Sequence, residues 1–258
     1  MKTKQPTFAT LIKDFEYRYD LRTVFDDFLT LTICACSQNP ATGLSYDEEL
    51  YLQTIDRYKT DDLRHHFPEM FACLTSEMGD RVGSDMGNDI LGEFYEQHLY
   101  RKGASQYFTP WPICSFMAKI TTDTIDVHAT REPLRILDPC CGSGRLLLAS
   151  AKENGPSHEY YGIDIDHTCV KMTAINMFLN GMFHSEVMCG DALRPDDFRG
   201  SYKISFLPFG IFRVAEKEDS WLWWLHRNSF QNVKPKDEQP EFVFQGKSMG
   251  AATQLKLF

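Results

Sequence analysis

Residues 135–148 read RILDPCCGSGRLLL. A short apolar run, Ile136-Leu137, ends in Asp138 and is followed by a turn that contains Gly142 and Gly144. A second apolar run comes next, so strand, glycine turn and helix is the simplest interpretation. The glycines allow the backbone to approach a ligand closely, and Asp138 adds a carboxylate at the strand end. The stretch therefore predicts a ligand site at the carboxyl end of a buried strand.

Three more strands are expected after this unit. They cover residues 160–163, 186–189 and 202–205, and the first two run into Asp164 and Asp191. An apolar helix is expected between those two. Strands that alternate with helices predict an α/β fold with a parallel, doubly wound, Rossmann-like sheet. Such sheets bind ligands beyond the carboxyl ends of their strands, which is where this sequence places its glycines and aspartates.

The chemistry of the glycine turn narrows the class of ligand. The spacing departs from Gly-x-Gly-x-x-Gly and no Gly-Lys-Ser/Thr is present, which disfavours a dinucleotide and excludes the usual nucleoside-triphosphate loop. An aspartate in the loop repels phosphate and attracts an ammonium or sulfonium group, which favours S-adenosylmethionine. Asp164, roughly 20 residues further on, stands where an acidic residue accepts hydrogen bonds from ribose hydroxyls. Asp191 is either a turn cap or an acceptor for an adenine amino group.

The rest of the chain divides into three parts. Apolar residues recur at helical spacing before the sheet, which predicts a helical N-terminal domain over 1–103. The α/β domain is expected over 104–245, and a flexible tail over 246–258. Only a short piece follows Gly210, with Trp221, Trp223 and Trp224 in it, so the sheet is expected to be truncated. These tryptophans either stack on bases or, as their spacing favours, belong to a helix packed on the sheet.

Composition excludes several classes of protein. The 258 residues carry a formal charge of −9 and 43% hydrophobic residues, which indicates a folded chain with a buried core. No apolar run reaches a membrane span and the N-terminus lacks the apolar part of a signal peptide, so a cytoplasmic protein is expected. Eight cysteines form no Cys-x-x-Cys pair, and His65-His66 lack a carboxylate at ligand spacing, so no metal site is expected.

Four motifs share their order and spacing with a known family. They are Gln106-Tyr107-Phe108-Thr109-Pro110, Asp138-Pro139-Cys140-Cys141-Gly142-Ser143-Gly144, Gly162-Ile163-Asp164 and Gly190-Asp191-Ala192-Leu193. Over about residues 106–210 they resemble adenine-N6 DNA methyltransferases, especially the modification (M) subunits of type I restriction-modification systems. The resemblance implies S-adenosylmethionine as the cofactor and DNA as the substrate. It implies eight cofactor-binding residues: Tyr107, Thr109, Asp138, Cys140, Gly142, Gly144, Asp164 and Asp191.

The fourth-strand segment departs from the family pattern. In the family, an Asn-Pro-Pro-Tyr/Phe segment holds a flipped-out adenine: the Asn accepts a hydrogen bond from the exocyclic amine, and the aromatic ring stacks on the base. The resemblance aligns this segment with Phe206-Leu207-Pro208-Phe209. Pro208 and Phe209 match the catalytic pattern, whereas Phe206 replaces the Asn. Loss of one such polar group typically costs about 2.7–4 kcal/mol, or 10²–10³ in rate.

Three functions are therefore open on the sequence alone. The first is a site-specific adenine-N6 DNA methyltransferase. The second is a catalytically silent, cofactor-binding or DNA-associated subunit of the same fold, because Phe206 replaces the catalytic Asn. The third is a methyltransferase for RNA or protein, in which Phe206 lines a pocket of another shape.

Partners are suggested by the end of the chain and by the lack of a visible target-recognition domain. Gln254-Leu255-Lys256-Leu257-Phe258 resembles the peptide with which bacterial proteins dock on the sliding clamp. An unstructured tether with apolar anchors suits such docking. The alternative for these residues is a terminal strand or a packed tail. Sequence-specific DNA reading is expected to come from a separate specificity subunit.

Overall fold

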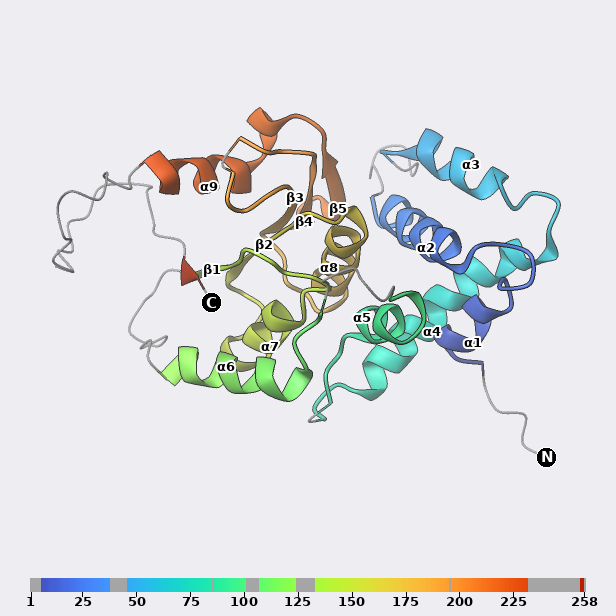
Figure 1. The fold of residues 1–258 in the computed structure, drawn as a ribbon, viewed down its shortest axis with the longest axis horizontal. Helices are drawn as coiled ribbons and strands as arrows, with labels where there is room; N and C mark the ends of the chain where they lie inside the picture. Colours follow the sequence, from blue (N-terminus) through green and yellow to red (C-terminus); the bar gives the residue numbers. More distant parts are fainter. Residues whose placement is uncertain are drawn as a thin grey trace, which may run out of the picture.

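The computed structural model describes residues 6–37, 46–84, 86–100, 107–123, 133–194, 196–231 and 256–257. A group of helices at the N-terminal end packs beside a mixed sheet that carries helices on both faces (Figure 1). The expected helical domain and α/β fold class are thus both seen. Within the described ranges, no helix is long and apolar enough to cross a membrane.

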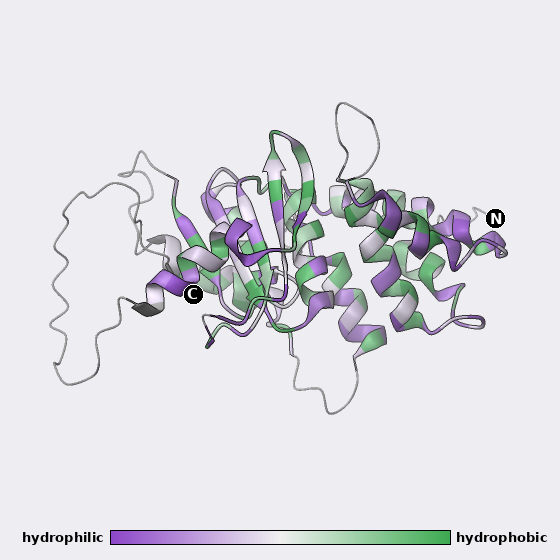
Figure 2. Ribbon diagram, turned by 90° about the horizontal axis from the view of Figure 1, so that it is seen from above, coloured by the Kyte–Doolittle hydropathy of each residue, from purple (hydrophilic) through white to green (hydrophobic). Residues whose placement is uncertain are grey.

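The helical part is built on apolar faces at helical spacing. Its elements are α1 (Phe8–Lys13), α2 (Leu21–Ala35), α3 (Glu48–Asp56), η1 (Asp62–His65), α4 (His66–Asp80), α5 (Ile90–Phe94) and the π-type turn η2 (Tyr95–Leu99). The longer helices alternate hydrophobic and hydrophilic residues along the ribbon (Figure 2). Asp20 begins α2 by accepting a hydrogen bond from the Thr23 amide. Phe25 and Phe28 of α2 are buried against Phe8 and Phe94, which joins three of the helices.

The described strands form one six-stranded sheet in the order β5-β4-β3-β2-β1-β6. The strands are β1 (Arg135–Asp138), β2 (Glu159–Asp164), β3 (Ser185–Cys189), β4 (Ser201–Phe206), β5 (Phe209–Val214) and β6 (Lys256–Leu257). The first three are parallel to one another, and β6 is parallel to β1. These pairings confirm the predicted parallel core of the sheet.

The fourth strand differs from the sequence prediction. We expected a parallel strand, whereas β4 is antiparallel to β3 and forms a hairpin with β5. A parallel neighbour needs a crossover of a dozen or more residues, usually with a helix. The described part of 190–200 contains no helix, so the chain turns straight back beside β3.

Helices cover both faces of the sheet. The helices α7 (Arg145–Asn154) and α8 (His167–Leu179) lie on one face, and α9 (Trp221–Gln231) lies on the other. Because side chains alternate along a strand, Ile136 joins the core under α7 and α8, whereas the next residue, Leu137, packs with Leu222 and Leu225 of α9. The helix that precedes β1, α6 (Trp111–Asp123), packs beside α7. The predicted helix around the tryptophans is confirmed.

The C-terminal stretch is partly in the sheet. Lys256 and Leu257 pair with Ile136 and Leu137 of β1, so these two residues form a strand instead of part of a flexible tail. The remainder of 246–258, including Gln254, Leu255 and Phe258, lies outside the described residues.

Candidate cofactor site

The glycine turn between β1 and α7 has a backbone that other residues adopt only with strain. Gly142 and Gly144 have φ angles of +55° and +83°. A Cβ on Gly142 would lie 2.8 Å from the Phe108 ring, and one on Gly144 would lie 2.9 Å from Thr173 Cγ2. Both positions therefore require glycine for conformation and for close packing, and the turn is held between the 107–110 segment and α8.

Asp164, at the end of β2, holds the same turn. Its Oδ2 accepts a hydrogen bond from the Gly142 amide at 2.9 Å, and its Oδ1 accepts one from the Asp166 amide at 2.9 Å. A carboxylate has about four acceptor positions, so Asp164 retains capacity for a ribose hydroxyl. The predicted acidic residue at this strand end is thus in contact with the glycine turn.

Asp138, at the end of β1, is more deeply buried. Its Oδ1 accepts a hydrogen bond from the Cys140 amide at 3.1 Å. Burial raises the pKa of Asp138, and the nearby charge of Asp164 raises it further. Burial also raises the pKa of Asp164. Two carboxylates that are short of solvent at neighbouring strand ends are stabilised by a cation. This donor set suits a group that carries ammonium and sulfonium charges.

Asp191 lies at the same edge, beyond β3. The Gly190 amide donates to the Asp164 backbone carbonyl at 2.9 Å, which brings the ends of β2 and β3 together. The Asp191 carboxylate accepts a hydrogen bond from the Leu193 amide at 2.9 Å and lies 3.4 Å from Arg194 Nε. Asp191 therefore caps the turn, which is one of the two roles predicted for it.

A buried cluster that the sequence analysis missed supports the glycine turn. Asp89 Oδ2 accepts hydrogen bonds from Ser143 Oγ at 2.5 Å and from Arg145 Nε at 2.9 Å. Asp89 Oδ1 accepts from the Gly92 amide at 2.9 Å and from Asn176 Nδ2 at 2.8 Å. One carboxylate thus joins α5, the turn, α7 and α8. The signal in the sequence was an arginine at the start of an otherwise apolar helix.

Arg145 connects this cluster to the 107–110 segment. Its guanidinium donates to the Thr109 carbonyl at 3.1 Å and to Glu96 Oε2 at 2.9 Å, and it lies over the Phe108 ring. The segment is thereby held beside the turn, while Tyr107 and Thr109 remain exposed. Cys140 is also exposed, on the turn itself. Gln106 lies outside the described residues.

The structure does not bring Phe206, Pro208 and Phe209 to this edge of the sheet. Because β4 is antiparallel to β3, with Ile204 opposite Ser185, the chain reaches Phe206 at the amino end of β3. The cofactor residues follow the carboxyl ends of the strands. A parallel β4 would place the Phe206–Phe209 turn beside the glycine turn. Because β4 is antiparallel, the turn lies at the other end of the sheet.

The hairpin turn forms an aromatic cluster of its own. Phe209 packs against Phe178 and Phe183 with ring centroids 5.0 and 5.6 Å apart, and Phe206 lies 5.5 Å from Phe183. Leu207 is exposed between them. Phe206 and Phe209 remain 53 and 57% exposed, so the turn carries a partly exposed group of aromatic rings.

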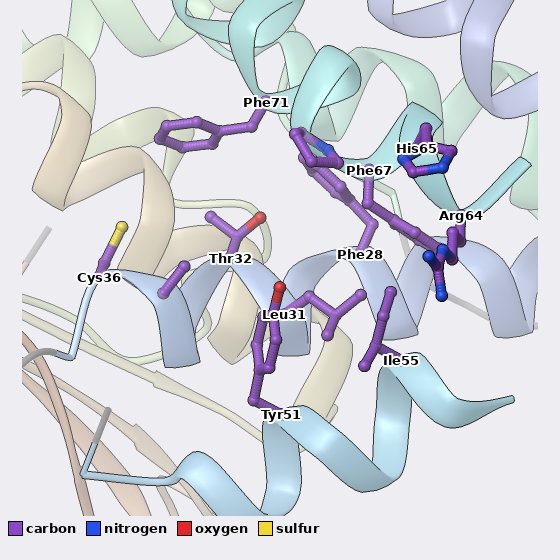
Figure 3. Close-up of a pocket in the computed structure, with 12 residues that line it drawn as sticks. Phe28, Leu31, Thr32, Cys36, Tyr51, Ile55, Arg64, His65, Phe67 and Phe71 are labelled. Atoms are coloured by element: carbon purple, nitrogen blue, oxygen red, sulfur yellow. The ribbon is translucent and has the colours of Figure 1, made fainter. Parts of the chain in front are cut away.

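A separate pocket of about 440 Å³ lies in the helical part (Figure 3). It opens between α2, α3 and α4 and is lined mainly by apolar side chains such as Phe28, Leu31 and Phe71, with Arg64 and His65 at one end. It is remote from the glycine turn. Among the described residues, no group of three or more His, Cys, Asp or Glu side chains is placed to hold a metal ion.

The α/β fold and the acidic strand ends suit an S-adenosylmethionine-dependent methyltransferase. The family model "N-6 DNA Methylase" matches residues 86–219, which is more than half of the chain. The chain belongs to this family, and the family implies S-adenosylmethionine as the cofactor.

Two curated relatives are named as a methylase subunit and a methyltransferase. The chain is 28% identical over 198 residues to the type I restriction enzyme MpnII methylase subunit of Mycoplasma pneumoniae, covering 70% of this chain and 35% of the relative. It is 27% identical over 123 residues to the type II methyltransferase M.MamI of Microbacterium ammoniaphilum, covering 42% and 34%. The chain thus matches about a third of the length of each relative.

A solved structure is also similar. It is the methyltransferase subunit of a type I restriction-modification system from Streptococcus thermophilus, which is 16% identical, with a TM-score of 0.36 and coverage of 73% of this chain and 57% of that one.

Proposed function

We propose that this chain binds S-adenosylmethionine at the carboxyl ends of β1, β2 and β3, as the cofactor-binding part of an adenine-N6 DNA methyltransferase. The observation that carries the proposal is the contact between Asp164 and the Gly142 amide, beside the buried carboxylate of Asp138. This arrangement places two acidic groups and an open backbone turn at one edge of the sheet, where ligands of such sheets bind.

Different residues at this edge bind different parts of the cofactor. When bound, S-adenosylmethionine supplies an electrophilic methyl group. Asp138 stabilises the positive charge of the cofactor, and Asp164 accepts hydrogen bonds from its ribose hydroxyls. Asp191, held in its turn by the Leu193 amide, would accept a hydrogen bond from the amino group of the cofactor's adenine. Tyr107 is exposed, with its ring centroid 5.6 Å from that of Tyr100, and would stack on the adenine.

The remaining cofactor residues shape the turn and its rim. Gly142 and Gly144 keep the turn open, and Cys140 presents an exposed surface beside Asp138. Thr109 adds its exposed side chain at the rim, and its carbonyl is held by Arg145.

The Phe206–Phe209 turn, the predicted acceptor side, lies away from the proposed cofactor site. Methyl transfer requires the reacting atoms to be about 3–3.5 Å apart. An adenine stacked on Phe209 would lie at the opposite end of the sheet from Asp138 and Asp164. We therefore infer that the chain alone is catalytically silent on DNA, and that a flipped-out adenine is methylated only when another polypeptide supplies the base-holding residues.

A methyl-transfer assay tests the inference that the chain alone does not methylate DNA. Labelled S-adenosylmethionine is incubated with unmodified genomic DNA and either the wild type or Phe206→Asn, and retention of label on the protein is measured in parallel. We expect cofactor retention by both and transfer by neither, because an amide at position 206 is placed at the wrong end of the sheet. A gain of transfer in Phe206→Asn would show that the hairpin reaches the cofactor, and would contradict the proposal.

DNA and two protein partners complete the proposal. A separate specificity subunit would provide target recognition, and the peptide Gln254–Phe258 would dock on the bacterial sliding clamp. Clamp docking requires Lys256 and Leu257 to leave their pairing with β1. Removal of Gln254–Phe258 should abolish co-purification with purified clamp, whereas undiminished recovery would remove the clamp from the proposal.

A further inference from the structure

The pocket in the helical part has the size of a small-molecule site and lies away from the proposed cofactor edge. Its volume is about 440 Å³, and sites for small molecules range from about 300 to 1,000 Å³. Phe28 and Leu31 of α2 and Phe67 of α4 form part of its wall and are at most 5% exposed. Because these three side chains belong to the packed core, this wall is in place before a ligand arrives.

The pocket is elongated along α2. Its lining on that helix runs from Phe28 to Ala35, which is about 10 Å of helix. Figure 3 shows Cys36 and Phe71 toward one end of the pocket and Arg64 toward the other. Apolar side chains cover most of the length between the two ends. The shape therefore suits a ligand with an extended apolar tail.

The Arg64 end of the pocket carries positive charge without a matching negative charge. Arg64 and His65 come from η1, and none of the 12 lining residues is acidic. Among the described residues, no carboxylate pairs with either side chain, and Asp61, directly before η1, is held by Arg18. The neighbouring stretch 38–45 contains no Asp or Glu. The charge of Arg64 is thus available to an anion that enters the pocket.

We propose that this pocket binds a small amphipathic carboxylic acid, which is an unbranched hydrocarbon chain of medium length that ends in one carboxylate. The carboxylate lies against the Arg64 guanidinium, whose planar donors match both carboxylate oxygens. The hydrocarbon chain lies along α2, between the side chains of α3 and α4. A cation at one end of an apolar pocket selects the acid over an alcohol, which lacks the charge, and over an amine, which the cation repels.

Chain length and head group test the pocket in the wild type. Octanoate is titrated into the full chain by calorimetry without S-adenosylmethionine, so the result does not depend on the proposed cofactor site. Burial of each methylene corresponds to about a fourfold gain in affinity. We therefore expect affinity to rise about fifteenfold from butanoate to hexanoate and again to octanoate. Octanol and octylamine should each bind about tenfold more weakly than octanoate.

The role of Arg64 is tested by Arg64→Gln. This variant should bind octanoate about tenfold more weakly and octanol with unchanged affinity, because only the acid uses the guanidinium. The matched control is Lys59→Gln, which removes a positive charge from an exposed side chain of the helical part that does not line the pocket. The control should bind octanoate as the wild type does. Far-UV circular dichroism checks the fold of each variant.

The position of the hydrocarbon chain is tested by Ala35→Trp. Ala35 is an exposed residue on the pocket wall, so a larger side chain there fills the pocket without displacing the core. Octanoate and octanol should both bind about tenfold more weakly to this variant.

Three results would overturn the proposal. A wild type that binds no octanoate up to millimolar concentration would leave the pocket to an apolar side chain of a protein partner. Equal octanoate affinity in the wild type and Arg64→Gln would remove the carboxylate from Arg64. Undiminished binding of octanoate by Ala35→Trp would place the ligand elsewhere on the chain.

Discussion

The carboxylate of Asp89 and the guanidinium of Arg145 lie 2.9 Å apart, with side chains only 1 and 8% exposed. The pair joins the helical part to the first residue of α7, directly after the glycine turn. Through Ser143 and Thr109 it also fixes the turn and the 107–110 segment. The cofactor edge is thus positioned by a residue that lies outside the sheet.

Removing one member of this pair should be costly. In Asp89→Ala, Arg145 keeps only its partly exposed partner Glu96, and the buried donors of Ser143 and Asn176 lose their acceptor. Loss of one partner of a buried pair costs about 3–5 kcal/mol. We expect the free energy of unfolding, measured with urea, to fall by that amount. The matched control is Asp56→Ala, which removes an exposed pair with Lys59 and should cost under about 1 kcal/mol. Equal small effects in the two variants would show that Asp89 does not carry the junction.

Gly142→Ala tests the conformation of the turn. At φ +55° an alanine is strained by about 1–2 kcal/mol, and its Cβ meets the Phe108 ring. We expect lower stability and weaker S-adenosylmethionine binding. Gly79→Ala is the control, because an added Cβ there meets no heavy atom within 4 Å, and the change should stabilise α4 by roughly 0.5–1 kcal/mol. A Gly142→Ala variant as stable as the wild type would argue against the strained turn.

Asp138 should make stability depend on pH. Burial raises its pKa in the folded state above the ordinary value of 3.8, so the folded chain binds this proton more tightly than the unfolded chain does. Stability is then lost as pH rises from the unfolded pKa through the folded one, and the loss persists at neutral pH. Asp138→Asn should therefore be more stable than the wild type at pH 7, with the difference vanishing near pH 3.

Replacement of Asp138 should change cofactor affinity in the direction opposite to stability. Because the charged form of Asp138 attracts a cation, S-adenosylmethionine should bind more weakly to Asp138→Asn at pH 7. Urea unfolding and calorimetry on the same samples separate the two effects. If Asp138→Asn were less stable than the wild type at pH 7, burial of the charged Asp138 carboxylate would not be destabilising, which would contradict this account.

Much of the fold follows from local pattern. The strands that end in Asp138 and Asp164, with the glycine turn between them, are where short apolar runs predict them. The strand ends bring these acids together because parallel strands share one carboxyl edge. That part of the site could be predicted from the sequence for this reason.

The rest depends on relationships that a local pattern does not contain. Asp89 is 56 residues from Arg145, so their pairing is a property of packing between two parts of the chain. β4 is antiparallel because the described connection before Ser201 contains no helix. The motif alignment of Phe206–Phe209 had predicted a parallel strand. The predicted cofactor residues lie together at the carboxyl ends of β1 to β3, whereas the antiparallel β4 carries Phe206–Phe209 to the opposite end of the sheet.

The most direct test is calorimetric titration of S-adenosylmethionine into the wild type, Asp164→Ala and Phe209→Ala. Asp164 contacts the glycine turn, whereas Phe209 packs with Phe178 at the other end of the sheet. We expect the wild type and Phe209→Ala to bind with the same affinity, and Asp164→Ala to bind about tenfold more weakly or worse, since it loses hydrogen bonds to a carboxylate. Absence of binding by the wild type, or equal affinity in all three, would contradict the account.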